Sequence, residues 1–209
     1  MLNKKNKLAV RILVVAIGLT LSGVGVGILL YSYLGADPAS VFYQGLINVL
    51  QLRYAYIAAI FNIVILSVVL LIDRKYVNIA SIMAIFLIGI SADLTSVALT
   101  HVFSAQLNVV VRGGMVVIGC AIMSLGIATY IHADLGVGAI DLISEIISEK
   151  RRLPYRWVRV ACDIIFVAVG FSLGGVFGIG TLLVAFLTGP LVQFFRCFVY
   201  RIIDPLLTV

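Results

Sequence analysis

One pattern of residues occurs twice along the chain. A shift of 101 residues places Arg11 on Arg112, Gly18 on Gly119, Gly25 on Gly126, Leu34 on Leu135 and Tyr54 on Tyr155. The register then slips by one residue, so that Gly89 falls on Gly189. Duplicated membrane proteins usually hold their working site between the two copies. The repeat therefore indicates where a functional site would lie.

The composition is that of a membrane protein. Hydrophobic residues make up 63% of the 209 residues and charged residues 11%, whereas soluble domains carry about 25% charged residues. The sequence predicts a single all-α membrane domain, with repeat one at about 9–100 and repeat two at about 110–202. The net charge of +6 resides in short clusters beside apolar runs, as in the cytoplasmic flanks of membrane helices, so nucleic acid is not an expected partner.

Six apolar runs are long enough to cross a bilayer, which takes about 20 helical residues. They are residues 9–33, 54–72, 78–100, 113–131, 156–173 and 179–200. Two shorter segments, 38–52 and 139–149, occupy the same place in each repeat. The second contains Asp141, Glu145 and Glu149, which are costly against lipid. We therefore expect both segments to be half-helices that dip into the membrane or lie on its surface.

Three full spans in each repeat would reverse the direction of the second copy, so we expect inverted repeats. With both termini in the cytoplasm, all of the 15 lysines and arginines except Arg53 and Arg112 are cytoplasmic, as the positive-inside rule requires. A bundle of eight spans with parallel repeats, in which both short segments cross, leaves only Arg74 and Lys75 outside and satisfies the rule equally. Segment length and the three acids favour six spans.

Glycines recur on one face of the first helix of each repeat. Gly18 and Gly25 match Gly119 and Gly126 in the second copy. In lipid, small residues let helices approach closely. We assign these four positions to helix packing rather than to a ligand.

Polar residues in the middle of apolar runs are the strongest candidates for a functional site. Asn62 and Asp163 lie halfway along equivalent spans. A carboxylate at the bilayer centre costs about 2.5–3.5 kcal/mol, so it must face water or the bundle interior. These residues would contact a substrate or a coupling ion. Alternatively, Arg159, which precedes Asp163 by four residues on the same face, forms a structural ion pair with it.

Asp93 is a second acid within an apolar run. It follows Gly89 by one helical turn, and its counterpart Gln193 follows Gly189 in the same way. A small residue followed by a polar one lets a neighbouring backbone approach a polar group, which suits the lining of a cavity. The structural alternative is an interhelical hydrogen bond, or an acid close to the outer surface.

The start of each half-helix carries further candidates. Asp37-Pro38 is a strong helix-opening signal with Asp as the cap, and Asp141 falls in the first turn of the second half-helix. Transporters often direct such helix ends at the substrate, and acids there favour a cationic or amine-bearing ligand or a coupling ion. Ordinary capping explains Asp37 as well. His132, which matches Tyr31, is either a pH-sensitive gate or a solvated surface residue.

Motifs for catalysis and cofactor binding are missing from the sequence. The chain has two histidines, no H-E-x-x-H sequence and no glycine-rich nucleotide loop. Its three cysteines lie in apolar segments without metal-like spacing. We expect no enzymatic activity, no cofactor and no metal.

The chain resembles the YczE/YyaS/YitT group of bacterial integral membrane proteins along essentially its whole length. The resemblance rests on LGADP at 34–38, DLGVGAID at 134–141, and GIGT at 178–181 followed by Gly189-Pro190. Ala139 departs from the proline that relatives often carry at this place. The resemblance implies a multi-pass protein of the bacterial cytoplasmic membrane, in a group suspected of small-molecule transport.

Together these features predict a small secondary transporter or a channel-like permeation protein. Its site would lie between the repeats near the midplane, with the lipid bilayer and a small molecule or ion as partners. The alternative is a non-transporting membrane subunit, either homo-oligomeric or beside another membrane subunit, that captures a solute for a partner complex or scaffolds it. Transport by the isolated protein would separate the two.

Overall fold

The structure is a computed structural model that describes residues 4–72, 78–103, 107–136 and 138–208. These residues form an all-helical bundle, which confirms the predicted all-α class. Its eight helices are α1 (Lys4–Ser32), α2 (Pro38–Leu50), α3 (Tyr54–Ile72), α4 (Ile79–Val102), α5 (Val109–His132), α6 (Ala139–Arg151), α7 (Tyr155–Ser172) and α8 (Ile179–Thr208).

Five of these helices are long and apolar enough to cross a membrane, namely α1, α3, α4, α5 and α8. The sequence analysis counted residues 156–173 as a sixth span, but α7 does not meet the same criterion. Its 18 residues include Arg156, Arg159 and Asp163, so its charge content is too high for a helix in contact with lipid on all sides. The protein is therefore a multi-pass membrane protein with five clear spans.

The two short helices match each other residue for residue. Both α2 and α6 contain 13 residues, about 20 Å of helix, which is too short to cross a hydrocarbon core of about 30 Å. Before each one the chain reverses at an equivalent glycine, with φ of +106° at Gly35 and +107° at Gly136, a conformation that only glycine adopts without strain. The predicted half-helices at 38–52 and 139–149 are therefore present.

The segment before each half-helix is bonded to the other repeat. The carbonyl oxygen of Leu34 accepts a hydrogen bond from the backbone N–H of Gly180 at the start of α8, at 2.9 Å. The equivalent carbonyl of Leu135 accepts one from Ala80 at the start of α4, at 3.2 Å. The same bond thus occurs twice with the roles of the repeats exchanged, which holds both half-helices between the two copies.

The centre of the bundle is an antiparallel pair of equivalent helices, α1 and α5. A Cβ atom added to Gly18 would lie 2.9 Å from the carbonyl oxygen of Gly126, and one added to Gly25 would lie 2.6 Å from that of Gly119. The early glycine of each helix therefore meets the late glycine of the other. All four glycines lie at a helix contact, where the sequence analysis assigned them.

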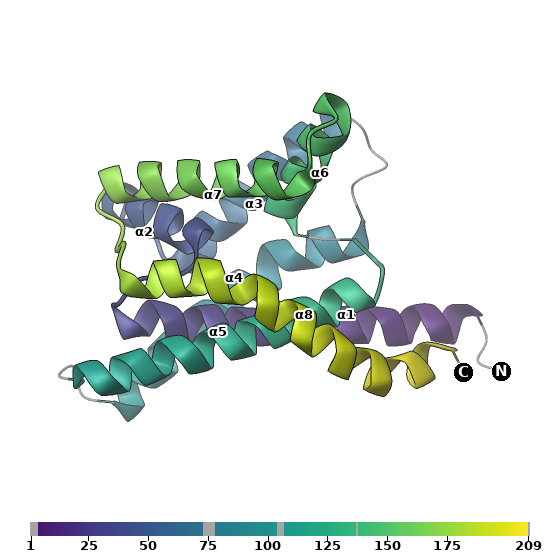
Figure 1. Cartoon of the computed structure of the whole chain (residues 1–209), viewed down its shortest axis with the longest axis horizontal. Helices are drawn as coiled ribbons and strands as arrows, with labels where there is room; N and C mark the ends of the chain where they lie inside the picture. Colours follow the sequence, from purple (N-terminus) through teal and green to yellow (C-terminus); the bar gives the residue numbers. More distant parts are fainter. Residues whose placement is uncertain (1–3, 73–77, 104–106, 137, 209) are drawn as a thin grey trace.

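The remaining helices surround this pair. Helix α4 packs on α1 and α8 packs on α5, while α2 packs on α7 and α3 packs on both α4 and α6. In Figure 1, α1, α5 and α8 run along the lower part of the molecule and α7 along the upper part. Helix α1 begins and α8 ends at the same end of the molecule. Helix α2 lies just below α7, and α6 stands at the upper edge of the molecule beside the start of α7.

Candidate functional site

Asp37 occupies the N-terminus of α2 and acts as its cap, as the sequence predicts. One carboxylate oxygen, Oδ2, accepts a hydrogen bond from the backbone N–H of Ser40 at 3.2 Å. The other oxygen, Oδ1, is buried and has no hydrogen-bond partner among the residues that the structure describes. Because a buried carboxylate oxygen without a partner is costly, this atom is a place for a bound proton, cation or water.

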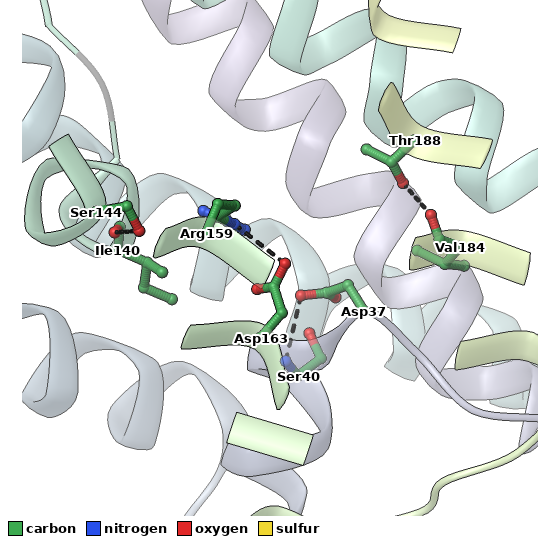
Figure 2. Close-up of polar contacts among 8 residues, drawn as sticks. All are labelled: Asp37, Ser40, Ile140, Ser144, Arg159, Asp163, Val184 and Thr188. Carbon is green, nitrogen blue, oxygen red and sulfur yellow. Dashed lines mark hydrogen bonds and ion pairs between the residues drawn. The ribbon is translucent and has the colours of Figure 1, made fainter. Parts of the chain in front are cut away.

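An ion pair from the second repeat lies in the same region. On α7, the Arg159 Nε donates to Asp163 Oδ2 at 3.2 Å, so the structural alternative raised for Asp163 is confirmed. The pair is not sealed, since the two side chains are 31% and 26% exposed. Figure 2 shows the Asp37 carboxylate beside this pair, and the charge of Arg159 acts on Asp37. Helix α2 of one repeat and helix α7 of the other thus bring two acids and one cation together.

Hydroxyl and amide groups extend this site into α3. The Tyr54 hydroxyl and the Ser40 hydroxyl are 2.8 Å apart and hydrogen-bonded. Tyr43 on α2 packs edge-on against Tyr54, with 5.7 Å between the ring centroids. Ser40 thus links the Asp37 cap to α3, the helix that also carries the half-buried Asn62.

Aromatic rings close one side of the site. The ring of Phe42 on α2 lies 4.8 Å from that of Phe61 on α3 and 5.4 Å from that of Phe166 on α7. Tyr43 packs edge-on against Phe61 at 5.6 Å. Such a cluster excludes water from this side, so the polar groups interact in a poorly screened environment.

Asp93 lines a cavity that it shares with Tyr54. Its Oδ2 atom accepts a hydrogen bond from the backbone N–H of Ala55 at 3.2 Å, in the first turn of α3. The cavity has a volume of about 280 Å³ and is also lined by Gln44, Tyr54, Ser96 and Thr100. Both predictions for Asp93 are met, because the residue makes an interhelical hydrogen bond and lines a cavity.

A second cavity of about 490 Å³ adjoins the first, with Tyr31, Tyr33 and Thr100 lining both. Arg112 at the start of α5 also lines it, and its guanidinium lies 5.9 Å from the centre of the Tyr33 ring. The two cavities lead from the ends of α1 and α4 toward Tyr54. Together we call them the vestibule. Tyr54, which lines the first cavity, is its floor, the residue that also bonds to Ser40.

Two of the predicted site residues, Gln193 and His132, do not join this cluster, and a third cannot be placed. Gln193 is exposed on α8, and His132 at the end of α5 packs edge-on against Tyr200 at 5.7 Å. Asp141 falls in the first turn of α6, but its side chain lies outside the described residues. Within the described part of the chain, no three His, Cys, Asp or Glu side chains gather closely enough to hold a metal ion.

Sequence reasoning missed the hydroxyl-bearing members of the site, Ser40, Tyr43 and Tyr54. Ser40 follows the Asp37 cap by three residues and Tyr43 follows it by six. Asp37, Ser40 and Tyr43 therefore share one side of a short helix. That spacing could have predicted Ser40 and Tyr43 as members of the site. The contact of Tyr54 with Ser40 could not be predicted, because it depends on how α3 packs against α2.

The amino-acid sequence of this chain is similar to those of other proteins. A family of unknown function, DUF6198, matches residues 9–197. The chain belongs to this family. A relative from Bacillus subtilis (strain 168) is described as uncharacterized membrane protein YczE. It is 26% identical over 161 residues, which cover 77% of this chain and 73% of the relative. The predicted resemblance to YczE is thus confirmed.

A second relative of the DUF6198 chain comes from Haemophilus influenzae (strain ATCC 51907 / DSM 11121 / KW20 / Rd) and is described as an uncharacterized protein. It is 27% identical over 187 residues, which cover 88% of this chain and 82% of the relative. No solved structure matches the chain. The relatives support membership in a membrane-protein family, and function has to be argued from the site.

Proposed function

We propose that this protein is a small secondary transporter, or a channel-like permeation protein, of the bacterial cytoplasmic membrane. Its site is the cluster of Asp37, Asn62, Arg159 and Asp163 between the two repeats, near the midplane. The observation that carries the proposal is the convergence of Asp37 from one repeat with the Arg159–Asp163 pair from the other. Two acids against one cation favour a cationic or amine-bearing solute, or a coupling cation.

The packing of the repeats supports an inverted arrangement. Equivalent helices α1 and α5 cross antiparallel, so a rotation that exchanges the repeats also exchanges the two faces of the membrane. The start of α1 and the end of α8 lie at one end of the molecule, as an even number of crossings requires. We assign the sixth crossing to α7, with Arg159 and Asp163 turned to the site, and both termini to the cytoplasm by the positive-inside rule.

Asp37 is the group best suited to couple transport to an ion. Its Oδ2 atom is held by the helix end, while Oδ1 is buried and without a hydrogen-bond partner in the described residues. Uptake of a proton or a cation at Oδ1 would satisfy this oxygen. Loss of that ion would leave a buried charge beside Arg159, so occupancy at Asp37 and the position of Arg159 are expected to change together.

Reconstitution in liposomes tests the proposal. The purified protein is assayed for uptake of a panel of amines, organic cations and zwitterions, with and without a pH gradient. Asp37→Asn keeps the cap but cannot take up a proton, and Asp163→Asn removes the partner of Arg159. We expect the uptake rate of each variant to be at least about tenfold lower. A tenfold decrease corresponds to a barrier that is higher by about 1.4 kcal/mol in the rate-limiting step.

The matched control is Asp134→Asn, which changes an exposed acid in the second repeat. Asp134 has a φ of +54°, a conformation that asparagine tolerates well. Uptake equal to the natural protein in both site variants would remove the cluster from the mechanism. Absence of uptake by the isolated protein, together with copurification of a stoichiometric membrane partner, would favour the subunit alternative.

A further inference from the structure

The two repeats differ in how their last two helices meet. Helix α3 packs on α4, whereas α7 and α8 hardly touch within the described part of the chain. A Cβ atom added to Gly89 of α4 would lie 3.1 Å from the Ala55 Cα and 3.5 Å from the Ala58 Cβ. A Cβ atom added to the equivalent Gly189 of α8 would meet nothing within 4 Å. Figure 1 shows α7 and α8 on separate levels of the molecule.

The sequence supplies a physical reason for this difference. The counterpart of Ala58, the alanine that faces Gly89, is Arg159 on α7. A guanidinium cannot fit in the space that separates Ala58 from Gly89, so α7 cannot approach α8 as closely as α3 approaches α4. Arg159 instead bonds to Asp163 on its own helix, at 3.2 Å.

Polar residues lie on both helices beside this opening, among exposed apolar side chains such as Phe186 and Ile164. Asp93 on α4 accepts a hydrogen bond from the first turn of α3, but its counterpart Gln193 is exposed on α8. The side chains of Arg159 and Asp163 are 31% and 26% exposed. An amide and an ion pair are costly in contact with hydrocarbon. These polar groups are therefore better suited to water than to lipid.

We propose that the opening between α7 and α8 is the water-filled path by which the Asp37–Asp163 cluster exchanges solute with the cytoplasm. The equivalent path between α3 and α4 is shut by the contact of Gly89 with Ala55 and Ala58 and by the Asp93 hydrogen bond. This inference rests on the proposed transport function and adds to it the side from which the site is open. In this arrangement the vestibule lies on the outer side of the membrane, next to the closed contact between α3 and α4.

Thiol labelling tests the path without any knowledge of the substrate. In a variant with Cys120, Cys162 and Cys197 replaced by serine, Gln193→Cys is compared with Phe194→Cys. Phe194 is the neighbouring residue on α8 and is 70% exposed, and its counterpart Leu94 is 65% exposed. The two thiols thus lie at the same depth, about 100° apart around α8. If the proposal holds, the thiol at 193 faces the opening and the thiol at 194 faces lipid. Each is treated with a charged, membrane-impermeant thiol reagent from the cytoplasmic face of inverted vesicles, and separately with a lipid-soluble maleimide.

We expect the charged reagent to label Gln193→Cys at least about tenfold faster than Phe194→Cys, because only a thiol in contact with water ionises and reacts readily. Similar rates for the two variants would overturn the proposal, as would a thiol at position 193 that reacts only with the lipid-soluble reagent. Reaction of Gln193→Cys with neither reagent would show that another segment or a second copy covers this face, which also overturns the proposal.

A disulfide tests the shut side. The Cβ separation of 3.5 Å between positions 58 and 89 lies within the range of a disulfide. Ala58→Cys with Gly89→Cys should therefore crosslink under mild oxidation. The crosslink is expected to stop uptake, and reduction to restore it. Labelling without uptake would leave the path intact and refute transport, whereas uptake without labelling would refute the path alone.

Discussion

The centre of the bundle and its periphery use the repeat in different ways. At the α1–α5 contact the two copies are interchangeable, since Gly18 meets Gly126 and Gly25 meets Gly119 at similar separations. At the periphery they are not, since Gly89 is packed against α3 and Gly189 faces open space. The same duplicated pattern therefore yields a symmetric contact in one region and an asymmetric one in the other.

The difference shows where side-chain volume decides structure. In the centre, each helix offers glycine to glycine, so both copies reach the same close approach. At the periphery, Ala58 in α3 and Arg159 in α7 occupy equivalent positions, but Ala58 lies against Gly89, whereas Gly189 has no neighbour within 4 Å of an added Cβ. Both repeats have the same order of helices. We attribute the closed α3–α4 contact and the open α7–α8 contact to a few side chains that differ in volume. Substitutions at both places measure how far the two regions differ.

The largest effect is expected at the centre. In Gly126→Leu, the new Cβ would lie 2.5 Å from the carbonyl oxygen of Gly18, and neither backbone can move away without separating α1 from α5. We expect a loss of about 3 kcal/mol or more in the free energy of unfolding, or failure to fold. Thermal unfolding in detergent measures it. Gly114→Leu, at a glycine with no neighbour within 4 Å, is the control and should be neutral within about 1 kcal/mol.

The next effect separates the two peripheral contacts directly. Gly89→Leu places a side chain against the Ala55 backbone and should lower the free energy of unfolding by about 1–3 kcal/mol. Gly189→Leu, the same change at the equivalent site, should leave it unchanged or slightly raised. Equal destabilisation by both, in the same thermal assay, would mean that α7 packs on α8 after all.

A smaller effect is expected at the floor of the vestibule. Tyr54→Phe removes the hydroxyl that bonds to Ser40 and should cost about 1 kcal/mol of stability. It should also alter uptake, because Tyr54 separates the outer cavities from the acid cluster. Tyr56→Phe changes an exposed tyrosine of the same helix and serves as the control. No difference between the two variants would remove Tyr54 from the site.

The smallest effect compares the two half-helices. Asp37 caps α2 with its side chain, whereas Gly138 starts α6 in the same backbone conformation without a side-chain cap. Gly138→Asn should add the missing cap and raise stability by a few tenths of a kcal/mol, and Asp37→Gly should lower it by a similar amount. Chemical denaturation of the two variants, measured side by side, would show whether the caps are equivalent. A loss of stability in Gly138→Asn would show that they are not.

Much of the fold could be read from the sequence, and the site only partly. The half-helices followed from their length and from the Asp37-Pro38 signal, and the central contact followed from the spacing of four glycines. The span count was less secure, because hydropathy cannot distinguish a helix that faces lipid from one like α7 that carries charges. Asn62 and Asp163 were predicted because an isolated polar residue in an apolar run needs an explanation, and Asp37 because Asp-Pro is a helix-opening signal.

What the sequence determined by itself is the plan: apolar runs too long for anything but membrane helices, duplicated along the chain, with short interruptions at equivalent places. Periodicity and hydropathy are local properties, so one copy of the pattern suffices to read them. The contact of Tyr54 with Ser40, the position of Asp37 beside the Arg159–Asp163 pair, and the exposure of Gln193 where its counterpart Asp93 is bonded to Ala55 follow from the tertiary structure. These outcomes depend on how far each outer helix leans toward its neighbour, which is set by the volumes of side chains distant in sequence.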